Sequence, residues 1–221
     1  MRAMVRGVLV VAGVASWVSG ASAQVPSAQE QALINAVSQQ LKAQDVITFS
    51  RVTREGELAS CEVVFETYYL DRRASQGRPV VIMGSIASMY SKGKYPSVTL
   101  KVKTNILDVQ GANPWRPVQP TFADAVIGQL ALKPYRVADF VCEGGGLCQM
   151  FVDKQMGHYK AILDAPRLDI DLRVSLAKGG MDQSLKLGGI GDPKAARAAL
   201  DGYQACTYEI LNKTIADMQQ M

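Results

Sequence analysis

The chain has 221 residues, of which 48% are hydrophobic and 20% are charged, and its formal net charge is +4. This length fits one ordinary domain or at most two small ones, and the apolar fraction is too high for a disordered chain. The single His, His158, excludes most metal sites built from several His ligands and leaves one residue for any Ser-His or Cys-His catalytic pair.

The first 23 residues predict a secretory signal peptide. Arg2 and Arg6 form a short basic segment, residues 7–19 are uncharged and mostly apolar, and Ala-Ser-Ala at residues 21–23 offers a cleavage site. A retained membrane anchor is the alternative, but the apolar run is shorter than the about 20 residues of a spanning helix. Cleavage would leave a single exported domain, residues 24–221, and would lower the net charge to +2. A basic surface for nucleic acid is therefore not expected.

The first part of this domain predicts a helix followed by antiparallel strands. A Ser-x-x-Glu capping pattern opens the range 27–43, in which apolar residues recur at helical spacing. After residue 46 the apolar residues recur at every second position, which is typical of strands. The expected strands are 47–51, 57–70, 79–88 and 98–103, with a hairpin turn at Gly56 between the first two.

The middle of the chain predicts a loop and three shorter elements. Gly, Asn and Pro are concentrated in residues 110–120, which we interpret as a loop. Residues 121–132 carry apolar side chains at helical spacing and are expected to form a short helix. Strands at 135–141 and 149–152 are expected to form a hairpin around a Gly-rich turn.

The last part predicts two strands and a long helix. Residues 168–176 alternate strictly between apolar and polar, and a further short strand is expected at 184–187. Asp192 and Pro193 have the residue types preferred at a helix start, and Gly202 is expected to bend or divide the helix that follows. The fold class predicted is α+β, mainly antiparallel and sandwich-like, with an N-terminal helix and a long C-terminal helix.

Four Cys in an exported chain predict two disulfides, for which three pairings are possible. Cys142 and Cys148 bracket three Gly residues that let the backbone turn sharply, so we expect these two to pair. Cys61 and Cys206 would then join the early strands to the C-terminal helix. A four-thiol metal site and a redox-active pair are the alternatives, and the absence of Cys-x-x-Cys spacing disfavours both.

Three charged or ionisable residues are considered for catalysis. Asp169 and Asp171 share one face of a strand, so they could act as acid and base or bind a cation. Arg173 continues that face, and a solvated surface with a salt bridge accounts for all three. His158 would need a nearby nucleophile, and the Gly-x-Ser-x-Gly motif that supplies one in hydrolases is absent.

Each of two further sequence patterns can be interpreted either as a binding site or as a structural feature. The Gly-rich segment 187–191 before a helix could hold phosphate, but Asp192 would repel it, which favours a turn with a helix cap. A group of aromatic residues could bind carbohydrate or a protein partner, although packing is expected to explain at least half of them. The group is Tyr68, Tyr69, Tyr90, Tyr95 and Trp115.

The order of motifs in the second half resembles a known family. A Cys-bracketed Gly turn is followed by an alternating strand ending in Ser175-Leu176, by Leu185-Lys186-Leu187-Gly188 and by an Ala-rich segment at 195–200. This order resembles the invasion-associated locus B family of bacterial exported proteins, over roughly residues 57–202. Two departures are the absence of the family's Phe in the segment 188–191 and the long helix that follows. The resemblance implies a small β-sandwich-like periplasmic or surface protein with structural disulfides, linked to host-cell entry.

These features predict a non-enzymatic exported protein of the bacterial envelope, in the periplasm or at the cell surface, that binds another envelope or host protein. No catalytic, cofactor-binding or metal-ligating residue is assigned, and no membrane span is expected after signal cleavage. One alternative is an envelope hydrolase or carbohydrate-binding protein that uses Asp169, Asp171 or His158. A second is a periplasmic chaperone-like accessory factor whose terminal helices dock a partner.

Overall fold

The computed structural model describes most of the chain after residue 27. The described residues are 28–70, 78–92, 96–107, 115–127, 130–131, 135–136, 141–142, 147–152, 156–176 and 183–220. The predicted signal peptide, Tyr95 and the three Gly residues between Cys142 and Cys148 lie outside them.

The larger of two layers is a seven-stranded antiparallel sheet. Its strand order is β1-β2-β3-β4-β10-β9, and β5 pairs with β4. The strands are β1 Val46–Arg54, β2 Glu57–Leu70, β3 Pro79–Met89, β4 Ser97–Leu107, β5 Trp115–Val118, β9 Val141–Cys142 and β10 Leu147–Val152. Glu55 and Gly56 between β1 and β2 both have positive φ, 55° and 81°, the backbone that a two-residue hairpin turn requires. The predicted first four strands and their hairpin are therefore confirmed.

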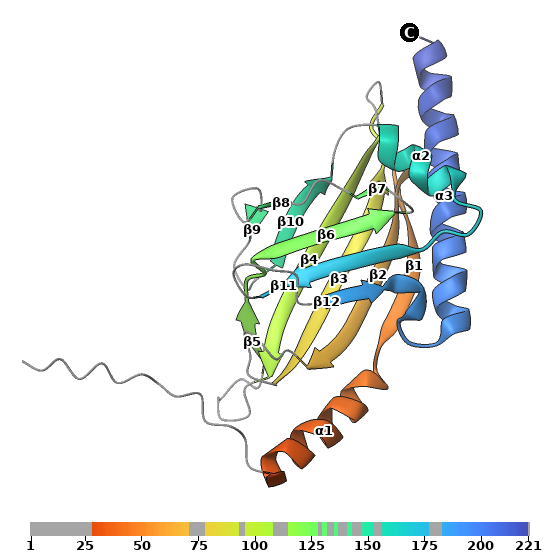
Figure 1. Ribbon diagram of the computed structural model, residues 1–221. Coiled ribbons are helices and arrows are strands. Elements are labelled where there is room, and N and C mark those ends of the chain that lie inside the picture. Colours follow the sequence, from red (N-terminus) through yellow and green to blue (C-terminus); the bar gives the residue numbers. More distant parts are fainter. Residues whose placement is uncertain are drawn as a thin grey trace, which may run out of the picture.

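A five-stranded antiparallel sheet forms the second layer. Its order is β12-β11-β6-β7, with β8 paired to β6. The strands are β6 Phe122–Ile127, β7 Leu130–Ala131, β8 Tyr135–Arg136, β11 Ile170–Ser175 and β12 Gln183–Lys186. Figure 1 shows this sheet in front of the larger one, with its strands crossing those behind at a steep angle. The arrangement is a two-layer sandwich, which confirms the predicted fold class.

Three α-helices among the described residues accompany the sheets. They are α1 Ala28–Lys42, α2 Met156–Asp164 and α3 Pro193–Gln219, and a single 3₁₀ turn, η2 Leu187–Gly189, precedes α3. α3 packs against β1, β2 and α2, so it shares the inner side of the larger sheet with the second sheet. α1 lies beyond one end of β2 and β3 (Figure 1). No helix among the described residues combines the length and apolarity that crossing a membrane requires.

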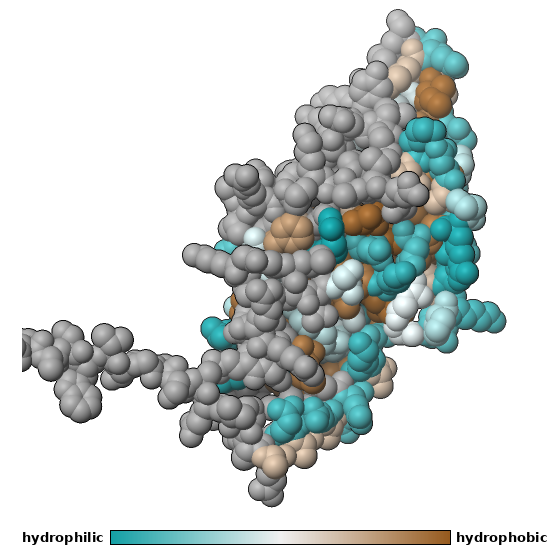
Figure 2. Space-filling view, in the orientation of Figure 1, coloured by the Kyte–Doolittle hydropathy of each residue, from teal (hydrophilic) through white to brown (hydrophobic). Residues whose placement is uncertain are grey.

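The core lies between the larger sheet on one side and the second sheet with α3 on the other. In β2 the odd-numbered residues point inward, and Val63 and Phe65 are almost completely buried. The cluster includes Ile86 and Leu100 from neighbouring strands and Tyr203 from α3. The solvent-facing side of α3 is mostly hydrophilic (Figure 2), as expected of an amphipathic helix that covers a sheet.

The predicted helix at 121–132 is wrong, because residues 122–127 form β6. Ala123, Ala125 and Ile127 are fully buried whereas Phe122 and Val126 are half-buried, which fits a period of two. Six residues of β6 pair with β11, from Ile170 opposite Ile127 to Ser175 opposite Phe122. A short apolar run fits either period, and pairing with a strand more than forty residues later decides the outcome.

Three other expectations also need correction. α3 continues through Gly202, so the predicted division of this helix is wrong, and the ring of Phe49 on β1 occupies the space that a Cβ atom at Gly202 would need. The predicted loop at 110–120 contains β5. The predicted strand at 135–141 is divided: β8 belongs to the second sheet, and only β9 pairs with β10.

Candidate functional site

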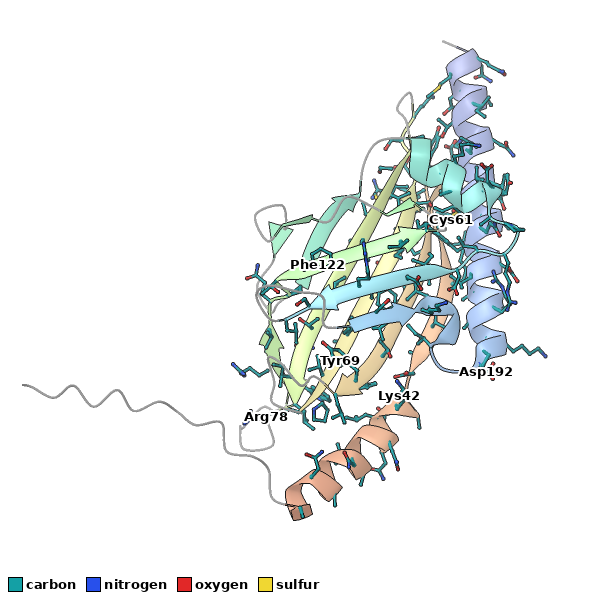
Figure 3. All side chains as sticks on the ribbon, in the orientation of Figure 1. Lys42, Cys61, Tyr69, Arg78, Phe122 and Asp192 are labelled. Atoms are coloured by element: carbon teal, nitrogen blue, oxygen red, sulfur yellow. A yellow bond between two sulfur atoms is a disulfide. The ribbon has the colours of Figure 1, made fainter. Side chains whose placement is uncertain are left out.

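A disulfide joins Cys61 on β2 to Cys206 on α3, which confirms the predicted long-range pair. The two Cα atoms are 5.8 Å apart, and 145 positions separate them in the sequence. Both residues are buried, 0% and 2% exposed, beside the core. Figure 3 places Cys61 next to α3, so the bridge fixes this helix to the larger sheet. Burial and the wide sequence separation both indicate a structural bridge.

The backbones of Cys142 and Cys148 lie opposite each other in the β9–β10 ladder. Their side chains lie outside the described residues, so the predicted bridge stays a prediction. Peptide mapping of the unreduced protein tests it: we expect one linked peptide pair from Cys142 and Cys148, and a peptide linking Cys142 to Cys61 would contradict the pairing.

Three buried hydroxyl groups lie beside the Cys61–Cys206 bridge. Ser88 Oγ and Tyr203 Oη are 2.8 Å apart, and Thr207 Oγ1 donates to Ser88 Oγ at 3.0 Å. Burial raises the pKa of Tyr203 well above its ordinary value. All three side chains are 0% exposed, so the group satisfies polar atoms within the core rather than offering them to a ligand.

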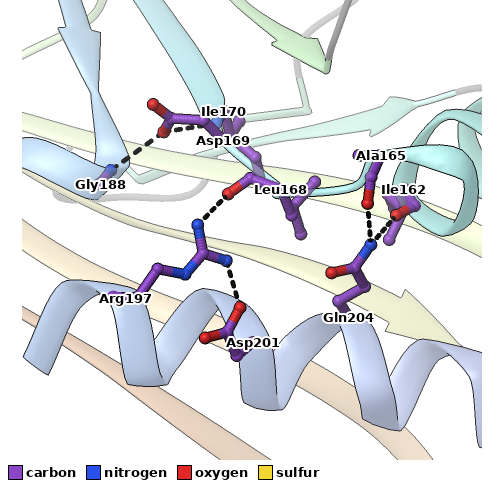
Figure 4. A network of polar contacts seen from close by, with 9 residues as sticks. All are labelled: Ile162, Ala165, Leu168, Asp169, Ile170, Gly188, Arg197, Asp201 and Gln204. Carbon is purple, nitrogen blue, oxygen red and sulfur yellow. Dashed lines mark hydrogen bonds and ion pairs between the residues drawn. The ribbon is translucent and has the colours of Figure 1, made fainter. Parts of the chain in front are cut away.

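The two acidic candidates, Asp169 just before β11 and Asp171 within it, have different surroundings. Asp169 Oδ1 accepts hydrogen bonds from the backbone N–H of Ile170 at 2.9 Å and of Gly188 at 3.1 Å (Figure 4). Asp171 lies opposite Lys186 of β12 in the ladder. Asp169 therefore holds η2 against the start of β11, and Asp171 belongs to a charged strand face.

A small cavity of about 340 Å³ adjoins Asp169, and its other lining residues are Arg167, Gly188, Pro193 and Arg197. The guanidinium of Arg197 donates to the carbonyl of Leu168 at 2.8 Å and to Asp201 at 2.5 Å. These contacts, drawn in Figure 4, engage Oδ1 of Asp169 and both terminal nitrogens of Arg197 within the chain itself, whereas Nε of Arg197 is buried without a hydrogen-bond partner among the described residues. Asp192 accepts a hydrogen bond from the backbone N–H of Ala195 at 2.7 Å, which confirms the turn and helix cap predicted in place of a phosphate site.

The other candidate residues lie in different parts of the structure. His158 lies on the backbone of α2, and its side chain is outside the described residues. Tyr90 donates a hydrogen bond to Asp217 on α3, and the ammonium of Lys213 lies 4.7 Å from the centre of its ring. Tyr90 therefore anchors the last turns of α3 and does not join the other aromatic residues.

Of the aromatic group predicted from the sequence, Tyr68 and Trp115 are in contact with each other in the structure. Their ring centres are 6.1 Å apart, and the rings are tilted by 54°. The hydroxyl of Tyr68 donates to a carboxylate oxygen of Glu66. Burial, and after it this hydrogen bond, raises the pKa of Tyr68 to about 12. The neighbouring Tyr69 is also buried, at the end of β2 that faces α1.

A cavity of about 730 Å³ lies between α1 and the adjacent ends of β2 and β3. Its lining residues are Asn35, Gln39, Lys42, Ala43, Tyr68, Tyr69, Leu70 and Pro79. Figure 3 shows Lys42 and Tyr69 at this end of the molecule. We call this cavity the α1 pocket. Its two Tyr residues, Tyr68 and Tyr69, belong to the aromatic group seen in the sequence, whereas the pocket itself was not expected.

The α1 side of the pocket is polar. Asn35, Gln39 and Lys42 follow a spacing of four and three residues, which places them on one face of the helix. From the sequence we expected this polar face, mostly Gln, Asn and Ser, to lie on the surface and the apolar stripe of the helix to be buried. In the structure Val37 and Leu41 of that stripe are half-buried. The polar row with helical spacing is the signal that could have located the pocket.

Asp45 fixes the end of the sheet beside the α1 pocket. Its carboxylate accepts hydrogen bonds from Thr67 Oγ1 at 3.0 Å and from the backbone N–H of Tyr68 at 2.9 Å. The chain between α1 and β1 is thereby attached to β2, next to the residues that form the aromatic side of the pocket. This side is preorganised, since backbone and side-chain hydrogen bonds both hold it.

Within the described ranges, no three His, Cys, Asp or Glu side chains gather as a metal site. The fold and site define a two-sheet α+β protein whose C-terminal helix is linked to the sheet by a disulfide and whose N-terminal helix borders a pocket. Comparisons with family models, with curated proteins and with solved structures gave no match.

Proposed function

We propose that this chain is a non-enzymatic exported protein of the bacterial envelope, in the periplasm or at the cell surface, and that it binds another envelope or host protein. The α1 pocket is the observation that carries the proposal. The Cys61–Cys206 disulfide supports export, because such bridges persist in oxidising compartments. The resemblance to the invasion-associated locus B family supports the bacterial envelope and a contribution to host interaction.

The composition of the α1 pocket suits a segment of polypeptide. Its sheet side offers Tyr69, Leu70 and Pro79, against which an apolar side chain could pack. Its helix side offers the amides of Asn35 and Gln39, which both donate and accept hydrogen bonds and so match peptide N–H and C=O groups. A volume of about 730 Å³ accommodates a few residues of a partner rather than a whole domain.

The chaperone-like alternative receives support from the same pocket, because one of the terminal helices forms its wall. Of the residues named for the hydrolase alternative, Asp169 is engaged with backbone N–H groups and Asp171 lies across from Lys186, while the side chain of His158 lies outside the described residues. A carbohydrate-binding function shares the aromatic and amide chemistry of the pocket and is an outcome of the test below.

Site-specific photo-crosslinking tests the proposal in the native envelope. A photoreactive residue at Gln39, which lines the α1 pocket, should give a crosslinked protein band. The matched control places the same residue at Gln40, which is exposed on α1 but does not line the pocket. The Asn35→Ala substitution should weaken the band from Gln39. Equal bands from both positions, or binding of soluble glycans instead of a protein, would contradict the proposal.

A further inference from the structure

The outer face of the larger sheet points away from the core. On this face the acidic and the basic residues lie on different strands. Glu62 and Glu66 are on β2, whereas Lys101 and Lys103 are on β4. All four are half-buried by neighbouring side chains and reach the surface. The ladder aligns Glu66 with Met83 of β3, and Met83 with Lys103. The face therefore carries an acidic strand and a basic strand with β3 between them.

These charges do not neutralise one another within the chain. Two strand spacings, about 9–10 Å, separate an acidic from a basic position in the same row, which exceeds ion-pair distance. Within the described ranges the acids accept from near neighbours: Glu66 accepts from Tyr68 Oη, and Glu62 accepts from Ser60 Oγ at 3.5 Å. Among the described residues, no ion pair involves Lys101 or Lys103.

The same face also exposes apolar side chains. Val46, Val52, Val64 and Met89 are 47%, 39%, 40% and 40% exposed. Their ladder positions place all of them on the outer face: Val46 is opposite Glu66, and Val52 and Met89 are both opposite Ser60. The second sheet and α3 pack on the inner face, and α1 lies at the strand ends. Exposed apolar residues beside charges that have no ion-pair partner in the described part of the chain are typical of an interaction surface.

We propose that this outer face binds a second copy of the chain, with a two-fold axis parallel to β3. Rotation about that axis places β3 over β3 of the second copy and β2 over its β4. Glu66 then faces Lys103 of the second copy, and the reciprocal pair forms on the other side of the axis. An axis perpendicular to the strands would place acid over acid and base over base. Charge complementarity therefore selects one symmetric arrangement.

The side chains near the proposed two-fold axis are small enough to let the two sheets approach each other. The middle of β3 carries the short side chains of Ser85 and Ala87, so two sheets can approach to the about 10 Å of ordinary face-to-face packing. Met83 and Met89 lie on the same strand and would contact their own copies, and Met is suited to filling irregular gaps. The inference does not depend on the proposed function, because the two charged rows do not line the α1 pocket.

Charge-reversal variants test the dimer directly by sedimentation velocity at low salt. The purified mature chain should sediment as a dimer that weakens as salt is raised. Glu66→Lys and Lys103→Glu should each raise the dimer dissociation constant by about 100-fold or more, because each places two like-charge pairs in the interface. A mixture of the two variants should associate again, since every interface pair is then an acid with a base. The double variant should also recover the dimer.

The matched control variants reverse the charge of residues that lie away from the outer face of the larger sheet. Glu55→Lys in the β1–β2 turn and Lys194→Glu at the start of α3 change the net charge equally and should leave association unchanged. Circular dichroism and thermal melting show whether each variant is folded. A monomeric wild-type chain, or single variants that still dimerise, would overturn the proposal. So would a mixture that fails to reassociate although both variants are folded.

Discussion

Gly84 shows how one missing side chain permits the packing of the core. A Cβ atom at this position would overlap the carbonyl oxygen of Lys101 on β4 and would lie 2.7 Å from Cζ of Phe65 on β2. The Phe65 ring thus covers the backbone of β3, and both are part of the inner face of the sheet. Neither the contact nor the need for glycine is visible in the sequence, where this position reads only as part of an apolar strand.

We expect Gly84→Ala to lower the free energy of unfolding by about 1–3 kcal/mol, the usual cost of forcing additional atoms into a packed core. Urea denaturation followed by circular dichroism measures the change. Gly189→Ala is the matched control, because a Cβ atom there has no neighbour within 4 Å, and its effect should stay within about 0.5 kcal/mol. An unchanged urea midpoint for Gly84→Ala would contradict the packing described.

The raised pKa of Tyr68 predicts that the folded chain loses stability at alkaline pH. Its pKa is raised to about 12 in the folded chain, first by burial and then by the hydrogen bond to Glu66. A phenol with an ordinary pKa of about 10 in the unfolded chain gives up its proton more readily there. Its contribution to stability is therefore complete below pH about 10 and is lost as the pH rises towards 12.

The Tyr68→Phe variant cannot ionise at this position. We therefore expect its free energy of unfolding to fall less steeply than that of the wild type over this alkaline range. Urea denaturation in a series of alkaline buffers measures both slopes. Tyr203 also has a raised pKa and remains in both proteins, so the difference between the slopes isolates Tyr68. Equal slopes would show that Tyr68 ionises alike in the folded and unfolded chains.

At the scale of elements, α3 organises the segments around it. The amide of Gln204 donates through Nε2 to the carbonyls of Ile162 at 2.7 Å and Ala165 at 2.8 Å, which are at the end of α2 (Figure 4). One helix thereby satisfies carbonyl groups that the end of another helix leaves without partners. The guanidinium of Arg197, two turns earlier, does the same for Leu168 before β11.

We expect Gln204→Glu to destabilise the protein by about 1–3 kcal/mol, because a carboxylate cannot donate to either carbonyl and would leave both of them unsatisfied. Chemical denaturation at neutral pH gives the value. Asn212→Asp, the same type of change at an exposed position of α3, is the control and should have little effect. A destabilisation of equal size in both variants would mean that helix charge, and not the lost donor, is responsible.

At the scale of the whole molecule, the Cys61–Cys206 bridge connects two elements that are far apart in the chain. It closes a segment of 145 positions, and loops of this length confer about 4–5 kcal/mol in the chain-entropy description. The double substitution Cys61→Ala and Cys206→Ala should therefore lower the unfolding free energy by about that amount. Denaturation without reductant measures it.

The wild-type protein in the presence of reductant supplies the control for the bridge. Its unfolding midpoint should move to that of the double variant, whereas the variant itself should respond only through any second disulfide. A wild-type chain as stable as the variant under oxidising conditions would show that the bridge contributes little to this fold.

Local signals in the sequence were sufficient for much of the fold. The strands from β1 to β4 follow from alternation, and the start of α3 follows from Asp192 and Pro193, because alternation and capping depend on residues that are neighbours in the chain. The Cys61–Cys206 pair also followed from the sequence, once a short Gly turn was assigned to the other two Cys.

Tertiary structure alone decided the remaining features. Residues 122–127 became a strand because β11 offered a partner ladder, and Gly202 lies inside α3 where the ring of Phe49 leaves no room for a Cβ atom. The α1 pocket and the separation of Glu66 from Lys103 by β3 depend on which segments meet in space. Periodicity and capping report on neighbours along the chain, whereas surfaces are formed by residues that are distant in sequence, and only the packed sheets bring these together.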